Sequence, residues 1–323
     1  MTAQTPSPAG TRVAPQDVTT VACVGTGVIG GGWVAYLLAR GYRVQAWDPA
    51  PGFADRLTVL IDDAWPALTQ LGLAPGASRD NLTITATLDD AVGDTEFVQE
   101  SAPEDLALKR RLLADLDAAT PEHVVISSST SGFTMSQMAA GIAGARRLVV
   151  GHPFNPPYLI PLVEVVGGEC TDPDVVAWTS AFFTHAGKSV ITMNREVPGF
   201  IANRLQEALW REALHMIAEG EATVEQIDAS ITQGPGLRWA FHGPMLTFHL
   251  AGGPGGMAHM LDHFGPSLLS PWTRLEAPPL TPELRAAAVA GCVDEAAGRT
   301  ISDLVRERDA NLIAVLRALG RVA

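Results

Sequence analysis

The chain has 323 residues, of which 47% are hydrophobic and 18% are charged, and this composition excludes a disordered chain, a collagen-like chain or a small disulfide scaffold. The length is enough for two domains of ordinary size. There are 35 acidic residues against 22 basic ones, a formal net charge of −13, and no basic run, so we expect neither nucleic acid nor a membrane surface as a partner.

Residues 1–18 are rich in Thr, Pro, Ala and Gln and lack the apolar stretch of a signal peptide, so we expect a flexible tail. The uncharged stretch that follows is long enough to cross a membrane, but a cluster of glycines in its middle predicts a strand, a tight turn and a helix instead. Cys23, Cys170 and Cys292 are widely spaced and fit no zinc-ligand pattern. Reduced thiols and a cytoplasmic location are the simplest interpretation.

Beyond the tail, strand-like apolar runs alternate with helical patterns, which is typical of a parallel sheet covered by helices on both faces. The expected strands are Thr20–Val24, Arg43–Trp47, Thr83–Ala86, Phe97–Glu100, Val124–Ser127, Arg147–Val150, Leu162–Val166 and Ser189–Met193. A helix over Pro173–Ala186 separates the last two of them. The first part of the chain therefore has the pattern of a doubly wound α/β domain.

After Pro198 the pattern becomes helical throughout. The expected helices are Gly199–Gly220, Val224–Ile231, Pro244–Ala251, Pro254–Phe264 and a last one from Pro282 to the C-terminus. We therefore place a domain boundary near Arg195, with an α/β dinucleotide-binding domain over 19–195 and a helical domain over 196–323.

The strongest local motif, Gly25-Thr26-Gly27-Val28-Ile29-Gly30, follows the first expected strand and opens the first expected helix. Its glycines permit a tight turn and the close approach of a pyrophosphate to the positive end of that helix. Asp48 closes the second strand, where a carboxylate binds both ribose hydroxyls and repels a 2′-phosphate. The motif therefore predicts NAD as cofactor. The alternative is a glycine-rich turn with an unrelated aspartate.

Polar residues follow later strands of the same sheet. Ser131 ends the run Ser127–Ser131, and His152 follows the next strand. Glu164 lies inside an apolar strand, so it would be buried and would fix the orientation of a histidine that acts as a base. Asn203 offers an amide at the start of the helical domain. The alternatives are a core histidine and an asparagine that caps a helix.

From about Val21 to about Leu261 these ordered motifs resemble the 3-hydroxyacyl-CoA dehydrogenase family. The resemblance implies a Rossmann-like NAD-binding domain followed by an all-helical domain that mediates homodimer formation. It also implies the roles of the site residues. His152 would be the general base and Glu164 its orienting partner.

In the same family pattern, Ser131 and Asn203 would hydrogen-bond the reacting oxygen. The family commonly has Asn-Thr-Ser where this chain has Ser129-Thr130-Ser131. This departure preserves Ser131 but leaves the role of Ser129 open.

The substrate class follows from further departures from the family pattern. Arg56–Asp80, where the family carries a lysine-rich helical insert that helps hold coenzyme A, contains no lysine. Gly234–Pro244 resembles instead the branches of the family that act on free L-gulonate and L-carnitine, and Met245–Met257 is most similar to the carnitine branch. The implied reaction is NAD-dependent oxidation of the 3-hydroxyl of L-carnitine to 3-dehydrocarnitine. The alternatives are L-gulonate or another short 3-hydroxy acid, a 3-hydroxyacyl-CoA, or a non-catalytic NAD-binding structural protein.

A carboxylate and a trimethylammonium each need their own binding group. Arg238 could clamp the carboxylate bidentately, or could belong to a structural ion pair. Aromatic faces hold quaternary ammonium groups, although aromatic residues more often pack in cores. The candidate rings are Phe154, Trp239, Phe241 and Phe264. His259 and His263 are spaced to share one helix face, but we expect no metal because hydride transfer to NAD needs none.

Overall fold

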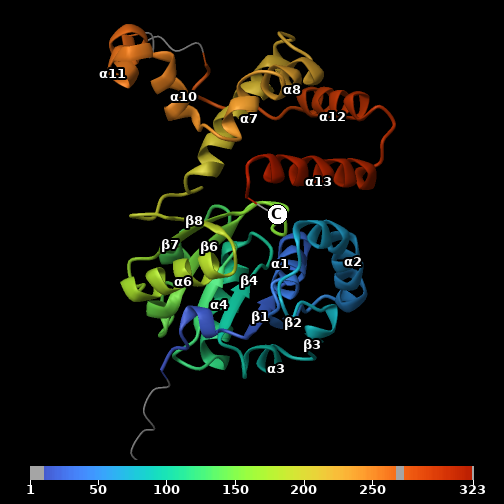
Figure 1. The fold of residues 1–323 in the computed structure, drawn as a ribbon, viewed down its shortest axis with the longest axis vertical. Coiled ribbons are helices and arrows are strands. Elements are labelled where there is room, and N and C mark those ends of the chain that lie inside the picture. The colour runs from blue at the N-terminus through green and yellow to red at the C-terminus, as the bar shows by residue number, and fades with distance from the viewer. Residues whose placement is uncertain (1–10, 267–272, 322–323) are drawn as a thin grey trace, which may run out of the picture. The chain divides into compact units, whose positions relative to one another are not determined.

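The computed structural model describes residues 11–266 and 273–321. The chain forms two compact units that divide between Ile201 and Ala202, a few residues beyond the boundary expected near Arg195 (Figure 1). The first unit is an α/β Rossmann-like unit and the second is helical, so the expected fold class is confirmed. The two units are described in turn.

The sheet of the first unit has the strand order β3-β2-β1-β4-β5-β6-β7-β8. Its strands are β1 (Thr20–Val24), β2 (Arg43–Trp47), β3 (Leu82–Ile84), β4 (Phe97–Glu100), β5 (Val125–Ser128), β6 (Leu148–Pro153), β7 (Leu162–Gly167) and β8 (Ser189–Thr192). The strand order reverses beside β1, and in sheets of this kind the ligand crevice lies at that point, outside the carboxyl ends of the strands.

The sheet is not parallel throughout, contrary to the expectation from sequence. β7 runs antiparallel to β6, and β8 is parallel to β7. Residues 154–161 between β6 and β7 are too few for the crossover that a parallel neighbour needs, so the chain must turn back. This reversal sets the register in which His152 stands opposite Glu164.

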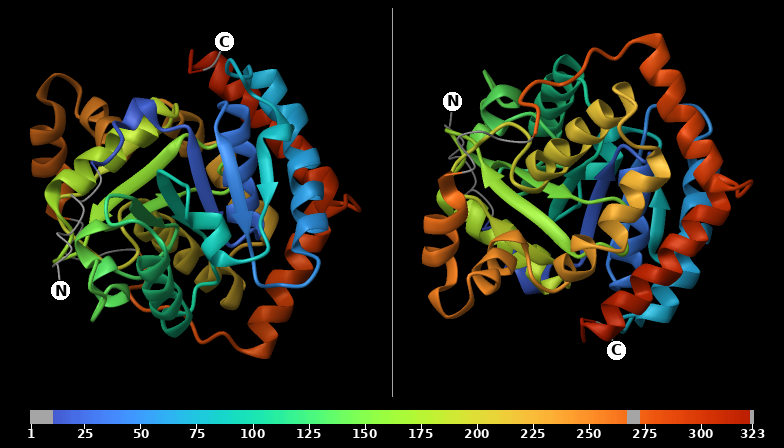
Figure 2. Two further views of the ribbon diagram at one scale, coloured as in Figure 1. Left: turned by 90° about the horizontal axis from the view of Figure 1, so that it is seen from below. Right: turned by 90° about the horizontal axis from the view of Figure 1, so that it is seen from above.

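Helices cover both faces of the sheet (Figure 2). One core cluster includes residues of α1 (Val28–Ala39), α2 (Phe53–Leu71) and α6 (Pro173–His185). The other includes residues of α3 (Leu88–Val92), α4 (Leu106–Ala119) and α5 (Met135–Met138). Alternate residues of β1 enter the two clusters, as the two-residue period of a strand requires: Val21 and Cys23 on one side, Ala22 and Val24 on the other.

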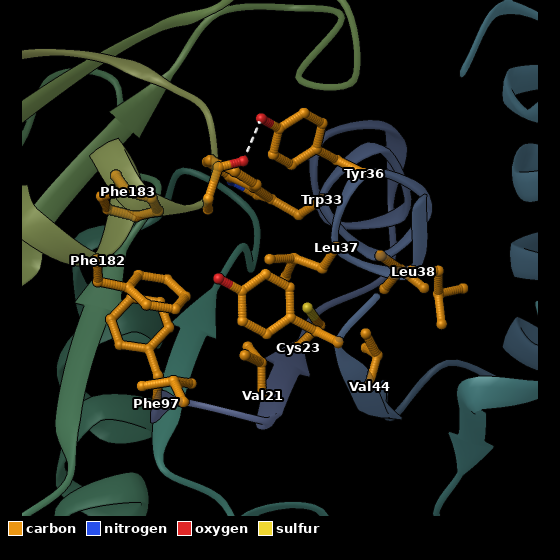
Figure 3. Packing of buried hydrophobic residues seen from close by; sticks show 14 of the residues in the cluster. Val21, Cys23, Trp33, Tyr36, Leu37, Leu38, Val44, Phe97, Phe182 and Phe183 are labelled. Atoms are coloured by element: carbon orange, nitrogen blue, oxygen red, sulfur yellow. Dashed lines mark hydrogen bonds between the residues drawn. The ribbon is translucent and has the colours of Figure 1, made fainter. Parts of the chain in front are cut away.

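The first cluster is rich in aromatic rings that join α1 to α6 (Figure 3). Trp33 stacks on Phe183 with ring centroids 5.4 Å apart. The Tyr36 hydroxyl donates to the Ala186 carbonyl at 2.7 Å, which ties the helix that follows the glycine loop to the end of α6. Large buried rings of this kind supply much of the apolar area that stabilises a domain.

The N-terminal segment departs from the expected flexible tail, of which residues 1–10 lie outside the described residues. Arg12 forms an ion pair with Asp174 at 2.9 Å. The Trp178 indole donates to the Val13 carbonyl at 2.7 Å, and Val18 is buried. Because Arg12 and Val13 bond to α6 and Val18 is part of the first core cluster, residues 12–18 belong to the first unit rather than to a tail.

The second unit contains α7 (Ala202–Ala218), α8 (Val224–Thr232), α9 (Pro235–Trp239), α10 (Pro244–Ala251), α11 (Gly256–Phe264), α12 (Pro282–Ala296) and α13 (Ile301–Ala318). The sequence predicted a single last helix, but the chain breaks it at Ala297 and Gly298, whose φ values are 51° and 79°. Thr300 then caps α13 through its side chain. Short α9 was not predicted.

None of the helices within the described ranges combines the length and the apolar composition needed to cross a membrane.

Candidate active site

The glycine loop between β1 and α1 is shaped by close backbone contacts. Gly25 has a φ of 85°, and a Cβ there would lie 2.8 Å from backbone atoms of Ser101 and Ala102. A Cβ at Gly30 would lie 1.8 Å from the Gly25 carbonyl oxygen. At Gly27, which caps α1, an added Cβ would meet nothing within 4 Å. The loop therefore leaves open space at the positive end of α1, as a bound pyrophosphate requires.

Asp48, just beyond β2, holds this loop in place. One carboxylate oxygen accepts the Thr26 N–H at 2.8 Å and the other accepts the Ala50 N–H at 2.9 Å. Val28 is exposed in the first turn of α1, next to Ile29. The open loop and the half-buried carboxylate at the end of the second strand fit NAD, with the glycines against the pyrophosphate and Asp48 at the adenosine ribose.

The ends of β4 and β5 are cross-linked through Ser129, whose role the sequence left open. Its hydroxyl lies 2.7 Å from the Gln99 amide nitrogen and 2.9 Å from the Ser101 hydroxyl. Ser101 also stands directly beneath the glycine loop, because it is one of the residues that a Cβ at Gly25 would strike. Ser129 therefore joins two neighbouring strand ends below the expected cofactor site.

Ser131 lies in the loop that follows β5, and a carboxylate that sequence reasoning missed holds that loop. Glu104 accepts the backbone N–H groups of Ser131 and Gly132 at 2.9 and 3.0 Å. The buried Lys109 ammonium lies 2.9 Å from Glu100 and 3.7 Å from Glu104. Both glutamates precede Lys109 in the sequence, and the N–H groups that Glu104 accepts lie in a loop 27 and 28 residues away, so no local sequence pattern marked Glu104.

The central feature is a buried histidine–glutamate pair. His152 in β6 and Glu164 in β7 are 3% and 0% exposed, and the imidazole Nδ1 lies 2.9 Å from Glu164 Oε2. Because a carboxylate can only accept, Nδ1 carries the proton and Nε2 carries the lone pair. The other oxygen of Glu164 accepts the Ile201 N–H at 3.0 Å. The imidazole is thus held in one tautomer, as a base requires.

Two phenyl rings contact the His152 imidazole. The half-buried Phe154 ring lies 4.6 Å away between centroids, with the planes at 63°. The fully buried Phe200 ring lies 5.2 Å away at 42°. Sequence reasoning selected Phe154 but missed Phe200, because an apolar residue after Pro-Gly resembles an ordinary helix start.

Asn203 and Arg238 lie in the second unit. Asn203 is in the first turn of α7, where its side-chain oxygen accepts from Gln206 at 3.4 Å. Arg238 is exposed on α9. Within residues 11–266 and 273–321, no carboxylate lies within salt-bridge distance of it, so the structural ion-pair alternative finds no partner there.

The other candidate rings, Trp239, Phe241 and Phe264, lie in the second unit. Phe241 contacts the ring of His242 at 4.7 Å and Phe264 contacts that of His263 at 4.6 Å. Trp239 is half-buried at the end of α9.

His259 and His263 stack with ring centroids 5.8 Å apart and planes at 6°. The described segments contain no group of three or more His, Cys, Asp or Glu side chains placed to hold a metal ion.

A glycine loop for a pyrophosphate, an acidic residue at the second strand end and an oriented histidine in the same sheet are the parts of a nicotinamide-dependent enzyme. The fold and this site define an NAD-dependent dehydrogenase. The 3-hydroxyacyl-CoA dehydrogenase NAD binding domain matches residues 20–197, and the C-terminal domain of the same family matches residues 199–294. The chain belongs to the 3-hydroxyacyl-CoA dehydrogenase family, which confirms the resemblance seen in the sequence.

Named relatives are similar over nearly the whole chain. L-carnitine dehydrogenase of Streptomyces griseus subsp. griseus is 72% identical over 309 residues, which are 96% of this chain and 92% of that protein. L-carnitine dehydrogenase of Streptomyces coelicolor is 70% identical over 95% of this chain and 97% of its own. The enzyme of the same name from Pseudomonas aeruginosa is 49% identical over 94% of each chain.

Among solved structures, 5-formyl-3-hydroxy-2-methylpyridine 4-carboxylic acid 5-dehydrogenase superposes with a TM-score of 0.81 at 28% identity, over 94% of this chain and 99% of its own. The (S)-3-hydroxybutyryl-CoA dehydrogenase of Ralstonia eutropha superposes with a TM-score of 0.61 at 26% identity, over 87% and 95% of the two chains.

Proposed function

We propose that this chain oxidises the 3-hydroxyl of L-carnitine to 3-dehydrocarnitine with NAD, and that His152 is the general base. The observation that carries the proposal is the buried His152–Glu164 pair, in a chain 72% identical to a protein named L-carnitine dehydrogenase. A ketone forms from a secondary alcohol only if the hydroxyl proton and a hydride both leave. The task of the general base is to accept the hydroxyl proton.

The geometry of the pair suits that task. Glu164 binds Nδ1, so Nε2 is the nitrogen that takes the hydroxyl proton. The Glu164 carboxylate then stabilises the imidazolium that forms. NAD, when bound, supplies the acceptor for the hydride. Ser131 and Asn203 are proposed, from the family pattern, to hydrogen-bond the reacting oxygen and orient the alcohol.

The region that would meet a coenzyme A substrate favours a small free acid instead. α2 contains no lysine, and it carries Asp62 in its exposed middle. Both arginines of this region are engaged within the protein: Arg56 donates to the Pro51 carbonyl at 2.7 Å, and Arg79 binds Asp62. Both guanidinium groups already have partners within the protein, whereas a nucleotide phosphate is normally bound by Lys or Arg.

Carnitine offers two charged groups for recognition. Arg238 is proposed as the carboxylate clamp, since a guanidinium can bind a carboxylate bidentately. Phe154 is proposed as an aromatic face for the trimethylammonium because it lies against the base itself. Trp239, Phe241 and Phe264 are proposed as further faces. L-gulonate and 3-hydroxybutyrate lack the cation and are the alternatives to be compared.

We further infer a homodimer from the apolar surface of the second unit. Large apolar side chains are exposed along its helices, which is unusual for a monomeric domain. They include Trp210, Met245, Phe248, Leu250 and Leu261. A second copy would remove them from water. A cytoplasmic location is also proposed, on the basis of the three free cysteines.

The base is tested by replacing His152 with Ala. We expect kcat for L-carnitine to fall by about 100-fold or more, the usual loss for a general base, while NADH affinity measured by fluorescence stays within about two-fold. His185→Ala, an exposed histidine at the end of α6, is the matched control and should leave both quantities unchanged. Normal turnover of His152→Ala at saturating NAD would disprove the assignment.

A further inference from the structure

The first unit ends in a turn over Val197–Ile201 that has an unusual backbone. The Phe200 N–H donates to the Val197 carbonyl at 3.1 Å and closes the turn. Gly199 and Phe200 both have positive φ values, 71° and 53°. Glycine adopts this conformation readily, but a bulky side chain seldom does, so the surroundings must impose it at Phe200.

This turn contacts three parts of the candidate site. The Ile201 N–H donates to Glu164 Oε1 at 3.0 Å. The Phe200 ring lies 5.2 Å from the His152 ring. The Gly199 N–H donates at 3.3 Å to the carbonyl of Gly132, the residue after Ser131. A single turn therefore connects the histidine, its carboxylate and the loop that carries Ser131.

We propose that Phe200 is a positioning residue for the proposed oxidation: its left-handed backbone aims the Ile201 N–H at Glu164, and its ring holds the His152 imidazole in place. The proposal rests on the proposed function only where it assigns a reaction to the His152–Glu164 pair. The effect of Phe200 on the geometry of that pair does not depend on the reaction. If Phe200 took an ordinary negative φ, the following peptide would rotate and the Ile201 N–H would leave Glu164.

The position of the Phe200 ring is fixed because its side chain is buried in the core. Its side chain is 0% exposed and packs with the core cluster that includes Val150 and Val166, one from each of the strands that carry His152 and Glu164. The ring is thus fixed by packing on the same strands that it supports. Glu164 in turn has one oxygen on His152 and the other on the turn, so its carboxylate links the imidazole to the backbone of the turn.

The test uses Phe200→Leu and Phe200→Gly, with Phe182→Leu as the control. Leu removes the ring and keeps apolar bulk, whereas Gly removes the ring and the constraint on the backbone as well. Phe182 is equally buried, but it belongs to the other core cluster, so its replacement reports general loss of stability. Each variant is assayed below its melting temperature for kcat and KM with L-carnitine and NAD.

A second readout is independent of any substrate. The Nδ1 proton shared by His152 and Glu164 should resonate downfield of the amide region in the proton NMR spectrum, and its loss in His152→Ala assigns it. We expect this resonance to weaken in Phe200→Leu and to vanish in Phe200→Gly. The corresponding kcat should fall by about 10-fold and by about 100-fold, since small misplacements of a reacting group carry losses of this size. KM for NAD should not change.

Phe182→Leu should retain both the resonance and kcat. Phe200 variants with the control's kcat and an intact resonance would overturn the proposal. So would equal losses in all three variants, because these would follow from stability alone. If no 3-hydroxy acid is oxidised but the resonance responds as described, the proposed function fails and the positioning role stands.

Discussion

Asp48 stabilises the glycine loop through hydrogen bonds within the protein itself. One oxygen accepts the Thr26 N–H of the glycine loop and the other accepts the Ala50 N–H after β2, so the negative charge is fixed in place. A fixed charge discriminates between cofactors, because the 2′-phosphate of NADP would meet it directly.

Asp48→Asn should therefore narrow the preference for NAD. The amide keeps a similar size but loses the charge, so kcat/KM with NADP should rise relative to NAD. Asp55→Asn, in the first turn of α2, is the matched control and should leave the preference unchanged. Steady-state kinetics with both cofactors measure this ratio. Equal use of NAD and NADP by the unaltered protein contradicts the role given to Asp48.

Phe154 gives the second prediction at this scale. If its ring face binds the trimethylammonium, Phe154→Leu should weaken recognition of carnitine by about 0.5–2 kcal/mol, a loss of about 2-fold to 30-fold in kcat/KM. The kcat/KM for 3-hydroxybutyrate, which lacks the cation, should change much less.

Phe133→Leu is the control for Phe154, since Phe133 is also half-buried in the first unit. It should leave the ratio of the two substrates unchanged. Equal losses for carnitine and 3-hydroxybutyrate in Phe154→Leu would show that the ring supports catalysis in general rather than the cation.

The sequence identified those site residues whose chemistry is unusual for their position. A glutamate in an apolar strand and a histidine after another strand are visible without a structure, and they do form a pair. Phe200 could not be identified in this way, because its role depends on a positive φ that the turn imposes. Glu104 was missed for a similar reason, since its bonds run to backbone N–H groups of a loop distant in sequence.

At the scale of elements, the β6–β7 reversal is the step that sequence patterns missed. Apolar runs predict where strands lie, but strand direction depends on the length and path of the connection between them. The loop over residues 154–161 is held by the buried Lys188, just before β8. Its ammonium donates to the carbonyls of Pro157 and Ile160 and lies 3.7 Å from the centre of the Tyr36 ring.

Lys188 makes stability depend on pH. Burial, and secondarily the charge of Arg40, lower the pKa of Lys188 from 10.5 to about 7. The unfolded chain keeps the ordinary pKa, so between pH 7 and 10.5 it binds more protons than the folded chain. The free energy of unfolding should therefore rise with pH in this window, by at most about 1.4 kcal/mol per unit from this group.

Urea unfolding of the unaltered protein and of Lys188→Met at pH 7 and pH 9 tests this prediction. The stability of the unaltered protein relative to the variant should increase at the higher pH, because only the unaltered protein carries the titrating group. A difference that stays constant or decreases between the two pH values contradicts the lowered pKa.

At the scale of the whole molecule, the exposed apolar side chains of the second unit predict self-association. Phe248 on α10 is 50% exposed, and Val59 on α2 in the first unit is 59% exposed. A chain of 34.1 kDa should elute as a dimer in size exclusion with light scattering. Phe248→Glu should shift the mass toward the monomer, since a charge cannot be buried unpaired in an interface. Val59→Glu should remain dimeric. A monomeric unaltered protein would contradict the inference.

The most direct test of the proposed function is the value of kcat/KM for NADH formation from L-carnitine, compared with L-gulonate, 3-hydroxybutyrate and 3-hydroxybutyryl-CoA under the same conditions. A binding site for a carboxylate and a quaternary ammonium predicts the highest value for L-carnitine. A higher value for any of the other substrates would contradict the carnitine assignment.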